Sequence, residues 1–227
     1  MIIGIHQPNY LPWLGYFNKI AQSDVFVFLD DVQFSKNGYC NRVRIFRGSK
    51  VAWLTVPVSY SFGDAIDRVA AAQPDWANHH LDALKSAYSN SPFFNEVWGH
   101  IEGMYRSIPD GGLAETNRYL VEAFASKLGL TCKFAQSSEM ETGDARGDDR
   151  LVALMRSLPG AKVYFSGRGG AEYQDEVKFS DAGFELAYTG FASPVYPQSE
   201  TPFTPGLSVV DAVFNVGWDE TRNLIAG

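Results

Sequence analysis

Two short apolar runs with a helical pattern between them constrain the fold of this 227-residue chain more than any other feature. Residues 1–5 suit a buried strand, and residues 25–29 are apolar throughout, which is typical of a strand covered on both faces. Between the runs, Trp13, Phe17 and Ile20 fall on one face of a helix. The start of the chain therefore predicts a β–loop–α–β unit, with polar side chains collecting after each strand. In open α/β sheets, ligands bind at that edge.

The loop after the first run is both polar and stiff. Pro8 and Pro12 disfavour regular structure in the residues before them, and Pro12 can serve as the first residue of a helix. Four polar side chains lie in or beside this loop: His6, Gln7, Asn9 and Tyr10. Polar groups that are held still are what a binding site needs. We therefore expect the loop to form the floor of a site, with a packed corner as the alternative.

The rest of the chain continues the alternation of strands and helices. Residues 43–59 predict two strands joined by a Gly-Ser turn, and residues 60–75 predict a surface loop. Further strands are expected within residues 130–140, at the start of residues 161–173 and within residues 184–191. Helices are expected at residues 79–88, 92–106, 116–128, 151–158, 207–217 and 219–226. This order predicts a single α/β domain over residues 1–227: a Rossmann-like, mostly parallel sheet flanked by helices, with a mainly helical insertion at 75–130.

Charge and composition exclude several classes of function. The formal net charge of −7 argues against generic binding to nucleic acid or to anionic membranes. The two cysteines, Cys40 and Cys132, are not spaced like metal ligands, and we predict no metal site. No signal-peptide pattern begins the sequence, and no apolar stretch reaches ~18 residues. We therefore expect a cytoplasmic protein without a membrane span.

Charged side chains gather after the second apolar run. Asp30 and Asp31 would point to opposite sides of a strand, so one can face a site, where it could bind magnesium, an amine or Arg42. The alternative is a simple strand-end turn. Arg42 and Arg44 would share one face of an extended segment and suit a phosphate clamp, or else a solvated edge strand. We interpret Cys40 beside them as a packed or exposed thiol rather than a nucleophile. Three further polar residues belong to this cluster: Gln33, Lys36 and Asn41.

Two further patterns bear on nucleotide binding. The stretch "SGRGGAEY", residues 166–173, could cradle an anion with its backbone N–H groups, although it is neither GxGxxG nor a P-loop. The β–loop–α start resembles that of nucleotidylyltransferases and pantothenate synthetases, in which an "HxGH"-type loop binds nucleotide phosphates. The loop "HQPNYLPWLGY" of this chain lacks the second histidine.

A longer resemblance covers nearly the whole chain. The block "IHQPNYLPWLGYFNKIAQSDVFVFLDDVQFSKNGYCNRVRI", and later "YFSGRGGAEY", "YPQ" and "LSVVDAVFN", resemble the WbqC-like proteins of bacterial polysaccharide gene clusters. The resemblance implies a role in making O-antigen (lipopolysaccharide) and related surface sugars. It points to these motif positions: His6, Gln7, Tyr10, Asp31, Gln33, Asn41, Arg42, Ser166, Gly167, Tyr173, Gln198 and Asp211.

Together these features predict an enzyme that transfers an acyl or aminoacyl group to the amine of a nucleotide-linked amino sugar. His6 would be the general base for the sugar ammonium, and Asp31 would orient His6 or hold the amine. Arg42 and Arg44 would grip the diphosphate, while Gln7, Tyr10 and Asn41 would bind sugar hydroxyls or an oxyanion. The donor would be an acyl thioester or an acyl-carrier protein. The alternatives are an ATP- and magnesium-dependent ligase or nucleotidyltransferase, and a non-catalytic nucleotide-sugar-binding partner of glycosyltransferases.

Overall fold

A five-stranded, fully parallel sheet forms the centre of the molecule in a computed structural model that describes residues 1–199 and 202–227. The strand order is β7-β2-β1-β8-β9. From β1 the chain builds the sheet outward through β2 and β7, and then on the other side through β8 and β9. The strands are β1 (Ile2–His6), β2 (Val25–Phe28), β7 (Lys133–Gln136), β8 (Val163–Ser166) and β9 (Glu185–Tyr188).

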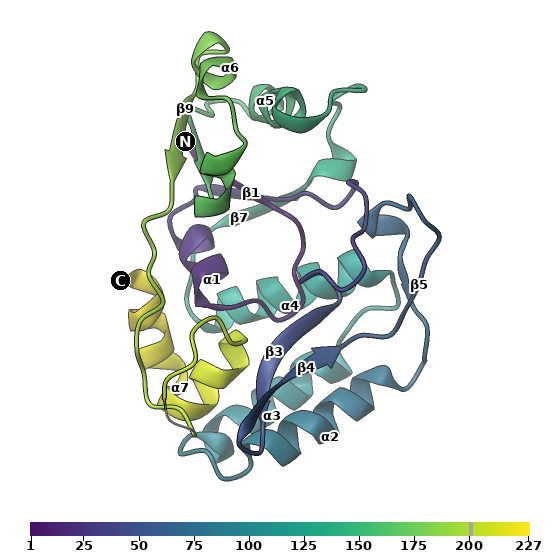
Figure 1. Cartoon of the computed structure of the whole chain (residues 1–227), viewed down its shortest axis with the longest axis vertical. Helices are drawn as coiled ribbons and strands as arrows, with labels where there is room; N and C mark the ends of the chain where they lie inside the picture. Colours follow the sequence, from purple (N-terminus) through teal and green to yellow (C-terminus); the bar gives the residue numbers. More distant parts are fainter. Residues whose placement is uncertain (200–201) are drawn as a thin grey trace.

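Helices cover both faces of this sheet, and a separate hairpin lies beside them (Figure 1). The helices are α1 (Leu14–Ala21), α2 (Trp76–Tyr88), α3 (Phe94–Arg106), α4 (Leu113–Lys127), α5 (Gly147–Ser157), α6 (Glu176–Asp181) and α7 (Val209–Ala226). The hairpin consists of β3 (Arg42–Arg47) and β4 (Lys50–Thr55). A second, separate pair consists of the short strands β5 (Val58–Ser59) and β6 (Ala70–Ala71). Three 3₁₀ turns are η1 (Ile66–Arg68), η2 (Ser137–Glu139) and η3 (Arg168–Glu172).

Alternation along the central strands divides the core into two parts. Phe26 and Phe28 of β2 point into a large cluster built from α1, α4, α7 and the helical middle of the chain. Val25 and Val27 point to the opposite face, where they pack with residues of α5 and α6, including Phe179. Successive side chains of a strand face opposite sides, so an all-apolar strand requires cover on both faces. Figure 1 shows α5 and α6 on one side of the sheet and α1 and α4 on the other.

The predicted α/β fold with a mostly parallel sheet and a helical middle region, α2–α4, is therefore confirmed. The Gly-Ser hairpin at residues 43–59 is also confirmed, with Arg47 paired to Lys50. No helix in the described ranges, 1–199 and 202–227, is long and apolar enough to cross a bilayer.

Three local predictions were wrong, two of them about the residue at which a helix begins. The helix α4 begins after Gly112 instead of at Thr116, and α5 begins at Gly147 instead of at Leu151. Residues 60–75 are more than a surface loop, because Ile66 and Val69 are fully buried in the core. In each case long-range packing extends order into residues whose local sequence favours turns.

The last helix, α7, is bent at Gly217, where two helices were predicted to meet. Gly217 has φ of 78°, and a Cβ placed there would lie 2.7 Å from the ring of Phe93. Ser208 caps the helix start, since its side chain accepts a hydrogen bond from the backbone N–H of Val210.

Replacing Gly217 with alanine should lower the free energy of unfolding by about 2–3 kcal/mol, because both backbone strain and the Phe93 clash would be introduced. Gly103→Ala in α3 is the matched control, since a Cβ there meets nothing within 4 Å and alanine favours a helix. Urea unfolding of the two variants tests this. Equal stability of both variants would contradict the argument.

Candidate functional site

The strongest candidate site is a cavity of about 400 Å³ at the carboxyl ends of β1 and β8. These two strands are neighbours, and the order of the sheet reverses between them. In open α/β sheets this reversal point leaves a crevice in which ligands bind. The polar residues that line the cavity are His6, Gln7, Lys19, Tyr164, Ser166, Tyr173 and Gln174, together with Gly167, Gly169 and Gly170.

His6 ends β1 and lines the cavity, as the sequence led us to expect for this residue. Its Nδ1 lies 3.0 Å from the carbonyl oxygen of Gln7, which can only accept a hydrogen bond. Nδ1 therefore carries the ring proton, and Nε2 has a free lone pair. Burial and the nearby Lys19 lower the pKa of His6 to about 4, so the imidazole is unprotonated at neutral pH. The Tyr16 ring packs edge-on against His6 at 4.9 Å between centroids.

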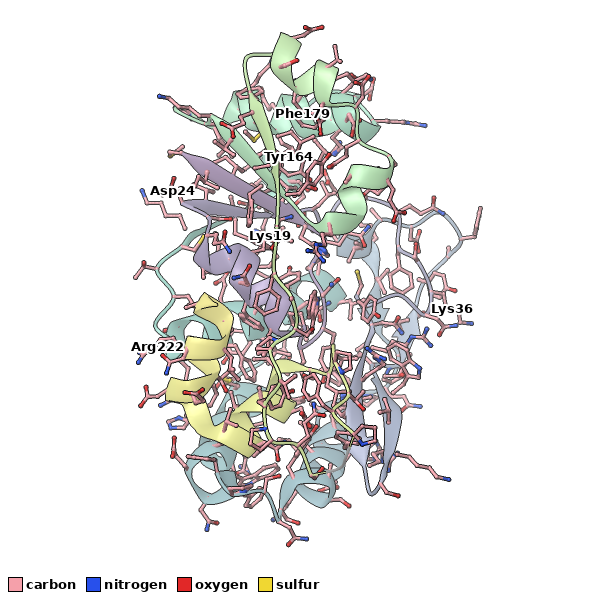
Figure 2. All side chains as sticks on the ribbon, turned by 60° about the vertical axis from the view of Figure 1, so that its left-hand side comes forward. Lys19, Asp24, Lys36, Tyr164, Phe179 and Arg222 are labelled. Atoms are coloured by element: carbon pink, nitrogen blue, oxygen red, sulfur yellow. The ribbon has the colours of Figure 1, made fainter. Side chains whose placement is uncertain are left out.

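Lys19 is a cavity residue that the sequence analysis missed. It lies on α1, is only 3 % exposed, and donates from Nζ to the carbonyl oxygen of Ile5 at 2.7 Å. Burial lowers the pKa of Lys19 to about 7. In Figure 2 it lies next to Tyr164, whose ring centroid is 5.8 Å from Nζ. In sequence, Lys19 has no signal beyond its place in a helix between two buried strands.

The glycine-rich turn after β8 forms the opposite wall of the cavity. Ser166 is the last residue of β8 and is buried, and Gly167 precedes the 3₁₀ turn η3. Tyr173 stands at the rim and is 76 % exposed. Gln174, which was not predicted, donates from Nε2 to the hydroxyl of Tyr164 at 3.2 Å, and its buried Oε1 has no protein donor. The turn therefore brings three predicted residues to the same cavity as His6.

The stiff loop after β1 contributes only its first residues to the cavity. Asn9, Tyr10 and Leu11 are buried, and the Tyr10 hydroxyl bonds His80 Nδ1 at 2.7 Å and the hydroxyl of Tyr105. From α4, Asn117 Nδ2 donates to the carbonyls of Pro8 at 2.9 Å and Cys40 at 2.7 Å. The loop is thus largely a packed corner, and this packing holds His6 and Gln7 at the cavity.

The two adjacent aspartates point to different partners. Asp30 is buried and accepts a hydrogen bond from the Ser138 hydroxyl at 2.8 Å. It shares the single hydroxyl hydrogen of Ser137, at 3.0 Å, with Asp31, and these bonds fix the turn after β7. Asp31 forms an ion pair with Arg150 of α5 and also bonds Ser137. Neither aspartate lines the cavity of His6, and the backbone of Gln7 orients the imidazole instead.

Asp31 and Gln33 line a second cavity of about 500 Å³, together with Arg146 and Arg150. Arg150 was not predicted from sequence. Gln33 also forms an isolated β-bridge with Ala65.

The basic side chains that follow the second strand, Lys36, Arg42 and Arg44, do not line the His6 cavity. Arg42 stacks on Trp53, with 4.0 Å from its guanidinium carbon to the ring centroid. Arg44 donates to the carbonyl oxygens of Pro205 at 3.0 Å and Gly206 at 3.3 Å. Asn41 is buried and bonds the carbonyl of Val56. Figure 2 shows the exposed Lys36 at the right-hand edge of the molecule, whereas Lys19 lies near its centre.

Gln198 and Asp211 belong to a buried network instead of the cavity. Asp211 accepts hydrogen bonds from the hydroxyls of Tyr88 at 3.1 Å and Tyr196 at 2.8 Å, and from Gln198 Nε2 at 3.1 Å. Burial raises the pKa of Asp211 to about 6. The Asp211 carboxylate is therefore used inside the core.

Cys40 is buried among neutral groups, and burial raises its pKa to about 12. This environment suits the packed thiol expected from the sequence, because a nucleophilic cysteine needs a lowered pKa. Within the described residues, no three His, Cys, Asp or Glu side chains come together as metal ligands.

Comparison with known proteins supports the resemblance seen in the sequence. The WbqC-like protein family matches residues 7–223, which include the loop after β1 and the glycine-rich turn after β8. The uncharacterized protein Rv1507c of Mycobacterium tuberculosis is 34% identical over 220 residues, covering 95% of this chain and 94% of that protein. No solved structure matches the chain. On these matches, the protein belongs to the WbqC-like protein family.

Proposed function

We propose that this protein transfers an acyl or aminoacyl group to the amine of a nucleotide-linked amino sugar in the synthesis of bacterial surface polysaccharide. The observation that carries the proposal is the unprotonated His6 in a cavity at the reversal point of the sheet. The cavity is large enough for part of a nucleotide sugar, and its lining offers hydroxyl, amide and ammonium groups. The polysaccharide setting comes from the family resemblance.

In the proposed reaction, the sugar amine attacks the carbonyl carbon of an acyl thioester. The new C–N bond forms, the C–S bond breaks, and the proton leaving the nitrogen passes through Nε2 of His6 to the departing thiolate. A pKa near 4 makes His6 too weak to hold the proton of an ordinary ammonium ion. His6 is a suitable base for the positively charged nitrogen of the adduct that forms when the amine attacks the thioester, because that nitrogen is far more acidic. We therefore place the action of His6 after the attack.

Replacing His6 with glutamine should lower the turnover of amide formation about 10²–10⁴-fold, the usual contribution of a general base. The assay is mass spectrometry of amide products from amino-sugar nucleotides mixed with acyl thioesters. His79→Gln is the matched control, since His79 is an exposed histidine on α2. Retained turnover in the His6 variant, with the melting temperature unchanged in both, would contradict the role.

The strand order favours one other candidate, an ATP-dependent ligase or nucleotidyltransferase. Counted along the chain, the sheet has the order 3-2-1-4-5, as in doubly wound nucleotide-binding folds. This candidate predicts that Mg-ATP raises the melting temperature and that amino-sugar nucleotides do not. The opposite result contradicts this candidate and leaves acyl transfer, which the amide-product assay tests, ahead of it.

A further inference from the structure

Lys19 is a buried charge without an acidic partner. Its only hydrogen-bond acceptor among the described residues is the carbonyl oxygen of Ile5, and no ion pair there includes it. A buried ammonium is costly unless a negative group compensates it. Since Lys19 also lines the cavity beside His6, that negative group can come from a ligand.

We propose that the cavity contains a subsite for a phosphate group, with the ammonium of Lys19 as its counter-ion. The subsite is placed between α1 and the glycine-rich turn after β8. No aspartate or glutamate lines the cavity, although the chain as a whole carries a net charge of −7. A cavity lining without carboxylates beside a buried cation favours an anion over a cation or a neutral group, although Asp148, outside the lining, acts on Tyr164.

The wall opposite Lys19 supplies room and neutral donors. Gly167 and Gly169 have open space where a Cβ would stand, so a bulky oxyanion can approach the backbone. Ser166 offers a hydroxyl, and the amide nitrogen of Gln174, which donates one hydrogen to Tyr164, has a second hydrogen to offer. Serine and amide groups with one lysine as a point charge are typical partners of phosphate oxygens.

This subsite replaces the arginine clamp expected from the sequence. Arg44 is held by the carbonyl oxygens of Pro205 and Gly206, and Arg42 stacks on Trp53; neither lines the cavity. The inference rests on the proposed function only for the identity of the ligand that carries the phosphate. Under that function, the phosphate belongs to the diphosphate of the sugar nucleotide. The anion chemistry itself stands apart from acyl transfer and can be tested separately.

An anion bound at Lys19 must raise the pKa of Lys19, because a nearby negative charge favours the protonated amine. The other titratable groups lining the cavity are His6 from β1, Tyr164 from β8 and Tyr173 after η3. Burial also raises the pKa of Tyr164, and His6 titrates well below pH 7. Lys19 is therefore the cavity group whose protonation an anion changes between pH 6 and 9.

The test is a pH titration of Lys19 by lysine-selective NMR on the full chain, with the resonance assigned by its loss in Lys19→Met. Sodium sulfate is the first probe, because it is a tetrahedral dianion that does not titrate in this range. Sodium chloride at equal ionic strength is the control. We expect sulfate to raise the pKa of Lys19 by at least one unit, and Lys19→Met to weaken sulfate binding at least tenfold. Lys50→Met, at an exposed hairpin turn, should bind as the unmodified protein does.

A second arm uses UDP-N-acetylglucosamine, whose diphosphate also does not titrate in this range, and a third uses acetate. A rise with the nucleotide sugar supports the subsite and places the ligand's diphosphate there. A rise with sulfate alone supports the subsite and contradicts the nucleotide-linked acceptor. If only acetate raises the pKa, or if none of the three does, the phosphate subsite is wrong.

Discussion

The melting temperature of the free protein should rise by roughly 5–10 °C at pH 7 when Lys19 is replaced with methionine. A pKa lowered from 10.5 to about 7 means that the charged amine costs roughly 4 kcal/mol at pH 7. Methionine has a similar volume and carries no charge, so the substitution removes this cost. The loss of the hydrogen bond to Ile5 offsets about 1 kcal/mol of the stabilisation. The expected net stabilisation is about 2–4 kcal/mol, together with the loss of anion binding.

The pH dependence of this gain has a definite sign. The folded pKa of Lys19 lies below its unfolded value, so its cost is absent above about pH 10.5 and grows as the pH falls to about 7. The stability difference between Lys19→Met and the unmodified protein should therefore widen from pH 10 to pH 7 and stay level below that. Urea unfolding at several pH values measures it. A variant that is less stable at pH 7, or a difference that does not change with pH, would contradict the burial of an unpaired ammonium.

Replacing Asn117 with alanine should lower the free energy of unfolding by roughly 2–4 kcal/mol. Asn117 is fully buried, and its Nδ2 satisfies the carbonyls of Pro8 and Cys40. Alanine leaves a small cavity and two buried carbonyls without this donor. The same change loosens the corner that positions His6 and Gln7, so ligand affinity should fall as well.

The control for Asn117 lies on the same helix. Ser126 is exposed, and its side chain makes no hydrogen bond among the described residues, so Ser126→Ala should change stability by less than about 0.5 kcal/mol. Thermal unfolding and titration with nucleotide sugars measure both effects. If Asn117→Ala destabilises the protein but keeps full affinity, the corner supports the fold without positioning the site.

The sequence predicted correctly those parts of the fold that depend on the pattern of neighbouring residues. Residues 25–29 are apolar on both faces, and the structure buries the strand β2 between two helical layers. The Gly-Ser turn depends on neighbouring residues alone, and it was predicted. The start of α5 and the burial of Ile66 depend on distant partners, and these predictions failed.

The candidate site shows the same division. His6, Gln7, Ser166, Gly167 and Tyr173 line the cavity because they follow β1 and β8, and strand ends can be located in a sequence. The pairing of β1 with β8 joins residues about 160 positions apart, and no local pattern encodes it. Tyr10 and Asp211 are polar residues that look functional in the sequence, yet their hydroxyl and carboxylate are used within the core.

The sequence by itself determined the elements, their order and the polar segments at two strand ends, because hydrophobic periodicity and turn residues act over a few positions. Only the tertiary structure decided which polar groups meet. It buried Lys19 beside His6 without an acid, paired Asp31 with Arg150, and turned Arg44 toward a backbone loop. These outcomes depend on side-chain direction and on desolvation in the assembled sheet, and both arise only when distant segments pack together.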